Sequence, residues 1–344
     1  EKMKAYAEAH PDLAKQFDMM QNCELPEDWE TIIPEFPADA KGLATRESSS
    51  KILNTIADKI PWFMGGSADL GPSTKTYIKE ASSFNKENYG GRNFHFGVRE
   101  HAMGAIINGM SLSKLRPYGA TFFVFSDYVR PAIRLSSLMK QPVVYIFTHD
   151  SIGVGEDGPT HQPVEHLASL RAMPGLDVIR PSDANELSVM WKYIMGLKDR
   201  PVALVLSRQG MPTLDRSKYA PADGALKGAY VLIESDGTPD VILIGTGSEM
   251  QICLDAYEQL TNEGINARVV SMPCCSLFQS QDKEYREKVL PRSVKARIVV
   301  EAGSTFGWHG YTGREDDCGI FGLKDFGASA PAGELYKEFG FTAE

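Results

Sequence analysis

The sequence predicts an α/β protein with two consecutive doubly wound domains, each built on a mostly parallel sheet. Apolar, β-branched runs alternate with helix-like segments, the pattern of a parallel sheet covered by helices on both faces. This alternation occurs twice along the 344 residues, a length that accommodates two domains. A polar stretch, SKYAPADG at 217–224, separates the two sets and predicts a linker.

Residues 1–40 belong to neither alternation. They are polar and contain four prolines, at positions 11, 26, 34 and 37, which interrupt any regular pattern. We expect an interdomain helix near residues 1–21, followed by an extended linker.

The first domain is predicted over residues 41–216. Within 46–60, isoleucines recur every four residues, at positions 52, 56 and 60, as on one face of an amphipathic helix. Further helices are expected at 99–113 and 183–196. Short apolar runs predict strands at 62–66, 93–98, 119–125, 142–149, 176–181 and 201–208.

A second, smaller domain is predicted over residues 217–344. Its strands are expected at 240–249, 267–272, 296–302 and 319–325. Its helices are expected at 250–263, 282–290 and 333–339. Ligands of such sheets bind in the crevice beyond the carboxyl ends of the strands, so the segments that follow the strands are the candidate site.

The composition narrows the class of partners. The formal net charge is −9 at pH 7, whereas nucleic acids and anionic membranes bind mainly to basic surfaces. No apolar run reaches the length of a membrane span, and no signal peptide opens the chain. The five cysteines form no CxxC pair, which argues against a disulfide scaffold or a zinc site. We therefore expect a cytoplasmic protein that binds neither nucleic acid nor membranes.

One stretch, THDSIGVGEDGPTHQP at 148–163, is rich in reactive side chains and poor in apolar ones. It follows a predicted strand, so it lies where open α/β sheets bind ligands. Its histidines, His149 and His161, and its carboxylates can move protons and bind hydroxyl groups near neutral pH. A solvated surface turn would have a similar composition, so composition alone leaves both interpretations open.

This stretch and four further motifs occur in the order found in the transketolase family, and the sequence resembles that family in each of them. The other motifs are GGSADLGPS (65–73), FGVREHAMGAIINGM (96–110), YGATFFVFSDY (118–128) and LSRQ (206–209). The resemblance covers about residues 40–344 and corresponds to that family's pyrimidine-binding and C-terminal domains. The family's N-terminal diphosphate-binding domain, with its magnesium motif, has no counterpart in these residues. We therefore expect the chain to be part of a longer protein or one subunit of a split enzyme.

The resemblance implies a site for thiamine diphosphate. Glu100 matches the glutamate that hydrogen-bonds the cofactor's pyrimidine ring and makes it reactive, so we expect it to be catalytic. Phe122, Phe125 and Tyr128 match the aromatic wall around that ring, with Phe125 as the stacking residue. Asp69 matches a residue that supports the cofactor. The Mg²⁺ or Ca²⁺ that accompanies the diphosphate is expected on the missing domain, and no metal ligand is predicted in this chain.

The resemblance also implies a sugar phosphate as substrate. Arg46, Ser73 and Arg208 match phosphate-binding residues, and the planar fork of arginine suits a phosphate. In the loop, Asp157 matches the residue that reads the hydroxyl next to the reacting carbonyl. Two histidines complete the set of expected catalytic and substrate-binding residues. His149 is expected near the phosphate end, and His161 near the reacting centre.

The activity that the resemblance implies is transfer of a two-carbon ketol unit from a ketose phosphate to an aldose phosphate, in the pentose phosphate pathway. The expected partners are a second copy of the chain in a homodimer and a diphosphate-binding domain or subunit. Three alternatives remain at this stage. The chain could belong to a sister thiamine enzyme such as deoxyxylulose-phosphate synthase or a 2-oxo-acid dehydrogenase β-subunit, although the phosphate arginines argue against the latter. It could be a dihydroxyacetone synthase, or alone it could be an inactive dimerisation module.

Overall fold

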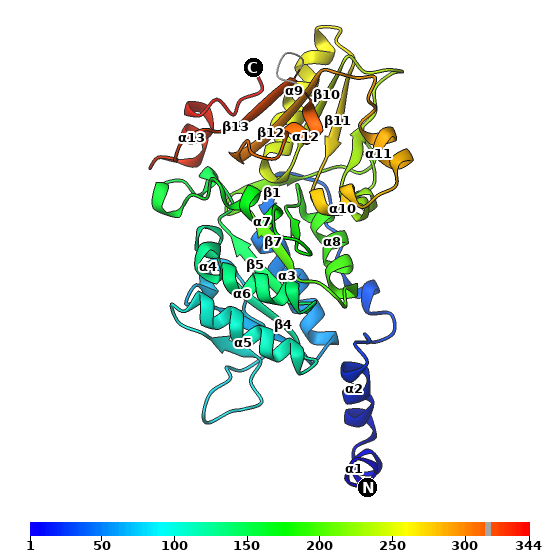
Figure 1. The fold of residues 1–344 in the computed structure, drawn as a ribbon, viewed down its shortest axis with the longest axis vertical. Helices are drawn as coiled ribbons and strands as arrows, with labels where there is room; N and C mark the ends of the chain where they lie inside the picture. Colours follow the sequence, from blue (N-terminus) through cyan, green and yellow to red (C-terminus); the bar gives the residue numbers. More distant parts are fainter. Residues whose placement is uncertain (314–317) are drawn as a thin grey trace.

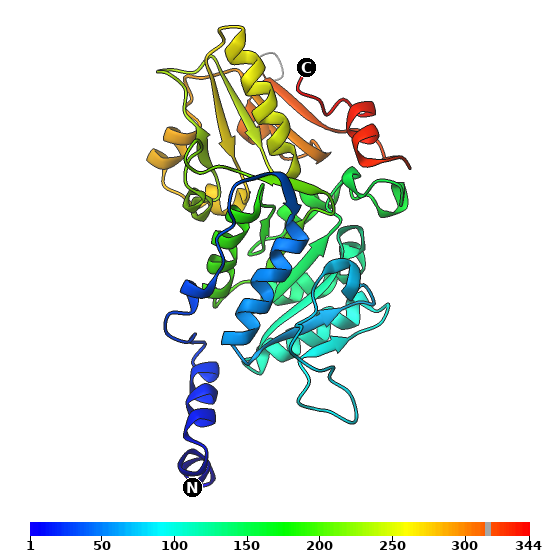
Figure 2. The ribbon, with the colours of Figure 1, turned by 180° about the vertical axis from the view of Figure 1, so that it is seen from behind.

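The computed structural model describes residues 1–313 and 318–344 (Figure 1). Two α/β bodies follow one another along the chain, and two N-terminal helices extend away from them (Figures 1 and 2). One body contains a six-stranded sheet and the other a five-stranded sheet. The predicted fold class, two consecutive and mostly parallel α/β domains, is confirmed.

The first sheet is parallel throughout, with the strand order β3-β2-β4-β5-β7-β6. Its strands are β2 (Phe63–Ser67), β3 (Asn93–His95), β4 (Arg116–Phe122), β5 (Val144–Thr148), β6 (Asp177–Ile179) and β7 (Val202–Leu206). Its main helices are α3 (Thr45–Lys59), α5 (Glu100–Leu112), α6 (Ser126–Leu138), α7 (His166–Arg171) and α8 (Ala184–Gly196).

The central strand β5 shows why this sequence folds between two helical layers. All five of its residues are buried, because alternate side chains enter different cores. Val144 and Ile146 join the core that contains residues of α3 and α8. Tyr145 and Phe147 join the core that contains residues of α5, α6 and α7. A strand covered on both faces has no polar side, which is why the sequence shows a continuous apolar run here.

The second sheet has the order β13-β12-β10-β11-β9, with only the edge strand β9 antiparallel. Its strands are β9 (Tyr230–Ile233), β10 (Val241–Gly245), β11 (Ala267–Ser271), β12 (Arg297–Ser304) and β13 (Cys318–Leu323). Its helices are α9 (Met250–Asn262), α10 (Cys275–Gln279), α11 (Lys283–Val289), α12 (His309–Thr312) and α13 (Ala332–Glu338).

Short elements complete the connections. They are α1 (Lys2–Ala9), α2 (Pro11–Gln21), α4 (Gly71–Thr74), β1 (Asp39–Ala44), β8 (Gly210–Thr213) and the 3₁₀ turns η1 (Trp29–Ile32), η2 (Phe123–Phe125), η3 (Ile152–Val154), η4 (Pro159–His161), η5 (Ala222–Lys227) and η6 (Gly247–Glu249). The antiparallel pair β1–β8, which the sequence did not predict, joins the two ends of the first domain.

Some predicted elements differ from the structure. The strand expected at 240–249 ends at Gly245, and residues 247–249 form the turn η6. The single helix expected near 1–21 is two helices, because His10 precedes Pro11 and leaves the helical conformation at φ −138°. The strand expected at 119–125 ends at Phe122, and residues 123–125 turn into α6. Phe123, the first residue after this strand, packs in the core with no exposed surface. Among the helices of the described residues, none combines the length and apolarity needed to cross a membrane.

Candidate active site

The predicted site residues converge on one edge of the first sheet. Strands β2, β4, β5 and β7 run parallel and lie side by side, so their carboxyl ends meet at that edge. Asp69 follows β2, Phe122 ends β4, His149 follows β5 and Arg208 follows β7. Arg46 reaches the same edge from the first turn of α3. The fold thus gathers residues that lie far apart in the sequence.

Arg46 and Arg208 place positive charge at this edge without neutralising it. One terminal nitrogen of Arg46 donates to the carbonyl oxygen of Ser73 at 2.9 Å, and its buried Nε has no hydrogen-bond partner among the described residues. Within the same described residues, neither guanidinium forms an ion pair with a carboxylate. Burial, and then the charge of Arg208, lower the pKa of Arg46. Two cations that repel each other in this way favour binding of an anion between them.

His149 is a buried neutral imidazole beside these arginines. Burial, and then the charges of Arg46 and Arg208, lower its pKa to about 3. Its Nε2 lies 3.3 Å from Arg46, which can only donate, so Nε2 accepts and Nδ1 carries the proton. Nδ1 donates in turn to the hydroxyl of Thr148 at 2.8 Å. The backbone of His149 has φ +64°, a strained value for a residue with a side chain, and such strain occurs often at functional sites.

Aromatic rings form a wall next to this histidine. Phe122 and Phe125 are almost parallel, with ring centres 6.1 Å apart and 6° between their planes. The imidazole of His149 stacks on Phe122 at 3.7 Å, and His161 approaches Phe125 edge-on at 5.7 Å. Tyr128 lies 6.0 Å from Phe125 and is 63% exposed. The wall is therefore open to solvent on the Tyr128 side.

Three predicted residues lie outside these contacts. Glu100 begins α5 and is only 8% exposed, yet its carboxyl makes no hydrogen bond or ion pair with the residues that the structure describes. Asp69 is exposed, with φ +61°. Asp157 is exposed in the loop between Gly155 and Gly158. In the described parts of the chain, no hydrogen bond joins Asp69 or Asp157 to the arginine and histidine cluster.

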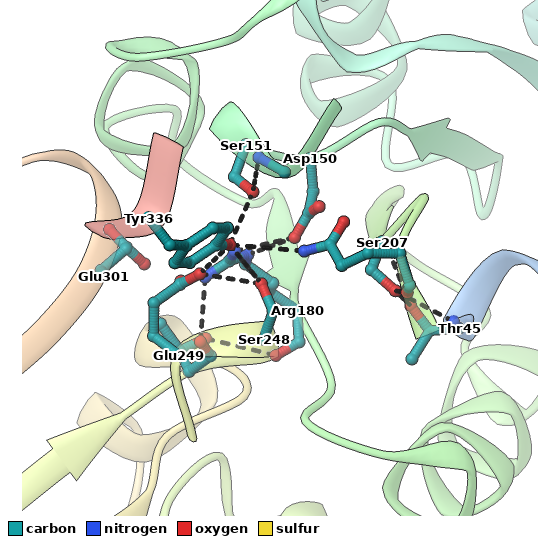
Figure 3. Close-up of polar contacts among 12 residues, drawn as sticks. Thr45, Asp150, Ser151, Arg180, Ser207, Ser248, Glu249, Glu301 and Tyr336 are labelled. Atoms are coloured by element: carbon teal, nitrogen blue, oxygen red, sulfur yellow. Dashed lines mark hydrogen bonds and ion pairs between the residues drawn. The ribbon is translucent and has the colours of Figure 1, made fainter. Parts of the chain in front are cut away.

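The sequence interpretation missed a buried ionic cluster behind the site. Arg180 lies between Asp150 and Glu249, and its Nη2 is 2.7 Å from Asp150 Oδ2 (Figure 3). The hydroxyl of Tyr336 donates to Glu249 at 2.8 Å and lies 3.2 Å from the hydroxyl of Ser151. Asp150 directly follows His149, so the cluster connects the site to the second domain. Its only sequence signal is that Arg180 and Glu249 lie at the carboxyl ends of predicted strands.

One other group of side chains could hold a metal ion. Among the described residues, Asp127, Glu165 and His166 bring one ligand atom each within 4.8 Å of one another. His166 Nε2 lies 3.2 Å from Asp127 Oδ2, and both carboxylates are more than half exposed. Exposed acidic side chains often lie close together without a bound ion, so we assign no metal to this group.

Comparison with known proteins identifies the family. Residues 41–213 match the transketolase pyrimidine-binding domain, and residues 228–342 match the transketolase-like C-terminal domain. A transketolase from Halalkalibacterium halodurans is 52% identical over 340 residues, which cover 98% of this chain and 51% of that protein. One from Bacillus subtilis is 52% identical over 339 residues, covering 98% of this chain and 50% of that protein. The chain belongs to the transketolase family. It spans about half the length of the curated transketolases that it matches.

Solved transketolases share the fold. A Pichia stipitis transketolase in complex with sedoheptulose-7-phosphate superposes with a TM-score of 0.93 at 40% identity, over 99% of this chain and 50% of that one. A second structure, described as a split-gene transketolase in an inactive β4 tetramer, has a TM-score of 0.71 at 27% identity. It covers 88% of this chain and 95% of its own, so that transketolase chain has nearly the same extent as this one.

Proposed function

We propose that this chain supplies the pyrimidine-binding and C-terminal portions of a working transketolase. The reaction is transfer of a two-carbon ketol unit from a ketose phosphate to an aldose phosphate. The observation that carries this proposal is the unneutralised pair Arg46 and Arg208 next to an open aromatic wall, in a chain that belongs to the transketolase family. The two relatives described above, both named transketolase, favour it over the sister thiamine enzymes that the sequence left open.

The residues present fit thiamine diphosphate as cofactor. The carboxyl of Glu100 is nearly buried and has no hydrogen-bond partner among the described residues, so it is available to hydrogen-bond the pyrimidine ring. We assign Phe125 to stacking on that ring, with Phe122 and Tyr128 beside it and Asp69 as support. When bound, the cofactor supplies an electron sink for the carbon unit being transferred. We propose that its diphosphate, with Mg²⁺ or Ca²⁺, binds to a diphosphate-binding domain on the same longer polypeptide or on another chain.

The substrate groups follow from the charges at the sheet edge. Arg46, Arg208 and Ser73 would bind the phosphate of the sugar. His149, neutral at pH 7, would orient Arg46 and hydrogen-bond the substrate, and it would not act as a proton donor. Proton transfer near the reacting carbon is then assigned to His161, which faces the aromatic wall. Asp157 would read the hydroxyl next to the carbonyl.

An exposed apolar surface supports a homodimer as the assembled form. Val98 precedes α5 and is 75% exposed, and Ile106 on that helix is 48% exposed. On α6, Tyr128, Leu135 and Leu138 are 63%, 47% and 69% exposed. Such a concentration of apolar side chains on two neighbouring helices is typical of a protein interface. We propose that the two copies meet here, in the cytoplasm.

Inactivity of the chain by itself is the second proposal. It is favoured by the split-gene structure, which is described as inactive and whose chain has nearly the same extent. Cofactor held only at its pyrimidine end would lack the metal-bridged diphosphate anchor. The isolated chain would then be a folded module that becomes active when the diphosphate-binding domain is present.

A reconstitution assay tests both proposals. Ketol transfer is measured with thiamine diphosphate and Mg²⁺ for the chain alone and for the chain joined to, or mixed with, a diphosphate-binding domain. We expect activity only in the second case, and we expect Glu100→Ala to abolish it while the circular dichroism spectrum stays unchanged. Activity of the chain alone would refute the second proposal. Wild-type turnover by Glu100→Ala would remove Glu100 from its role.

A further inference from the structure

The loop between β5 and α7, residues 149–165, contains no strand and is not part of the first sheet. Its backbone hydrogen bonds in η3 and η4 close short turns within the loop itself. Such a segment needs outside contacts to hold a single conformation, because its own turns recover little of the entropy lost on ordering. The loop carries two residues of the proposed site, Asp157 and His161, so these contacts decide where both side chains lie.

The second domain provides those contacts in the middle of the loop. The side-chain amide nitrogen of Gln162, Nε2, donates to Gly155 O at 2.9 Å within the loop. It also donates to Ala328 O at 2.8 Å across the domain boundary. The hydroxyl of Ser329 donates to Glu156 O at 2.6 Å. These anchors are immediate neighbours of the two site residues, since Glu156 precedes Asp157 and Gln162 follows His161.

Both ends of the loop are held by the same domain. At its start, Tyr336 on α13 contacts the hydroxyl of Ser151, beside the Arg180 cluster, and α13 packs against η3 (Figures 1 and 3). At its end, the backbone nitrogen of Ser304 on β12 donates to Val164 O at 2.8 Å. The loop is therefore fixed at its start, middle and end from outside its own domain.

The contact in the middle leaves no room for a side chain at Gly327. A Cβ there would lie 1.7 Å from Gln162 Oε1, although Gly327 has no left-handed backbone conformation. Gln162 is 2% exposed, so its amide cannot yield without losing its two hydrogen bonds. Gly155 also faces the second domain, although a Cβ there would lie 3.4 Å from Ala330 O, an ordinary van der Waals distance.

We propose that residues 327–332 of the second domain are a positioning element for the sugar-binding loop. They hold Gln162 and Glu156, and through them they set the positions of His161 and Asp157. The second domain would then contribute to substrate selection, although none of these residues is assigned to contact the substrate. The inference rests on the proposed transketolase function for its kinetic consequences, but not for the ordering of the loop.

The test uses the intact enzyme, with its diphosphate-binding domain present. Gly327→Ala is compared with Gly333→Ala, a matched control in which the added Cβ meets no atom within 4 Å. Ser329→Ala, a milder change of an exposed side chain, is compared with Ser280→Ala, whose hydroxyl bonds only to Leu277 O of its own domain. Amide hydrogen exchange of residues 151–163 and kcat/KM for two ketose phosphates that differ in one hydroxyl are measured for each variant.

We expect Gly327→Ala to accelerate exchange in the loop and to lower kcat/KM about tenfold or more, because small misplacements of substrate-binding groups reduce rates strongly. The ratio of kcat/KM between the two sugars should fall as well, which a general loss of stability would not cause. Ser329→Ala should show the same changes at smaller size. Exchange and selectivity equal to those of the controls would overturn the inference. Faster exchange in an enzyme whose wild type transfers no ketol unit would support the positioning element and refute the proposed function.

Discussion

Replacing Arg180 with methionine should destabilise the folded chain strongly at neutral pH. The guanidinium is 1% exposed, pairs with Asp150 and Glu249, and donates to the carbonyl of Thr246 at 2.9 Å. Methionine would fill part of the volume and leave two carboxylates, 2% and 0% exposed, without a cation. Removing one partner of a buried ion pair costs about 3–5 kcal/mol. We expect a loss of at least that size in the free energy of unfolding at pH 7.5.

The loss should shrink as the pH falls. In the wild type, burial acts to raise the pKa of Glu249, but Arg180 overcomes this and holds the pKa below its usual value. Burial raises the pKa of Asp150 even with Arg180 present. Without the cation, both carboxyl groups would have raised pKa values in the folded state. Ionising them then destabilises the fold at high pH, and protonation relieves that penalty at lower pH.

Urea unfolding at pH 7.5 and pH 5 measures both effects. Arg292→Met is the control, because Arg292 is 79% exposed and pairs with Glu287, which is 43% exposed. Its cost should stay below about 1 kcal/mol at either pH. A cost of less than about 1 kcal/mol for Arg180→Met at pH 7.5, the level of an exposed pair, would refute the reasoning. So would a deficit that grows between pH 7.5 and pH 5.

Two further predictions concern the loop. In the intact enzyme, Asp157→Ala should reduce discrimination between hydroxyl stereoisomers about tenfold or more while phosphate affinity stays unchanged, as measured by kcat/KM and by competition with inorganic phosphate. Unchanged stereoselectivity would contradict the role of Asp157. His149 should show no titration by NMR between pH 5 and pH 8, because its folded pKa is about 3. The unfolded histidine binds a proton below about pH 6.5, so stability should fall as the pH drops through that value. An imidazole signal that shifts near pH 6.5 would contradict the neutral state.

Most strands of the first sheet could be predicted because a strand that is buried on both faces appears in the sequence as a continuous apolar run. The run PVVYIFT is almost continuously apolar because β5 is buried on both faces. A strand with one face in solvent would alternate apolar and polar residues. The short strands β1 and β8 have no such apolar run in the sequence. Asp39, Lys41 and Gly42 are polar or small, and their pairing with residues 210–213 depends on a contact far away in the sequence. The sequence pattern therefore indicates which strands are buried better than it indicates which strands pair with each other.

The candidate site also has features that the sequence predicted and features that it did not. Because His149 and Arg208 end predicted parallel strands, the alternation alone could place them on one edge of the sheet. Arg46 begins a helix, and it was expected near His149 only from the resemblance to transketolases. The neutral state of His149 was not predictable, because it depends on burial of the imidazole and on the charges of Arg46 and Arg208. The role of Gln162 was hidden for another reason. Its partner Ala328 lies 166 residues away, and the contact is to a backbone carbonyl, which no side-chain pattern encodes.

The ionic cluster gives a physical reason for the second domain to remain against the first. Apolar surfaces can slide over each other at little cost, whereas buried charges tolerate few arrangements. Arg180 pairs with Asp150 of its own domain and with Glu249 of the other domain. A shift of either domain would therefore leave a buried charge without its partner. Because Asp150 directly follows His149, the fixed point between the domains coincides with the start of the sugar-binding loop. The same three charges thus link the packing of the two domains to the start of the sugar-binding loop.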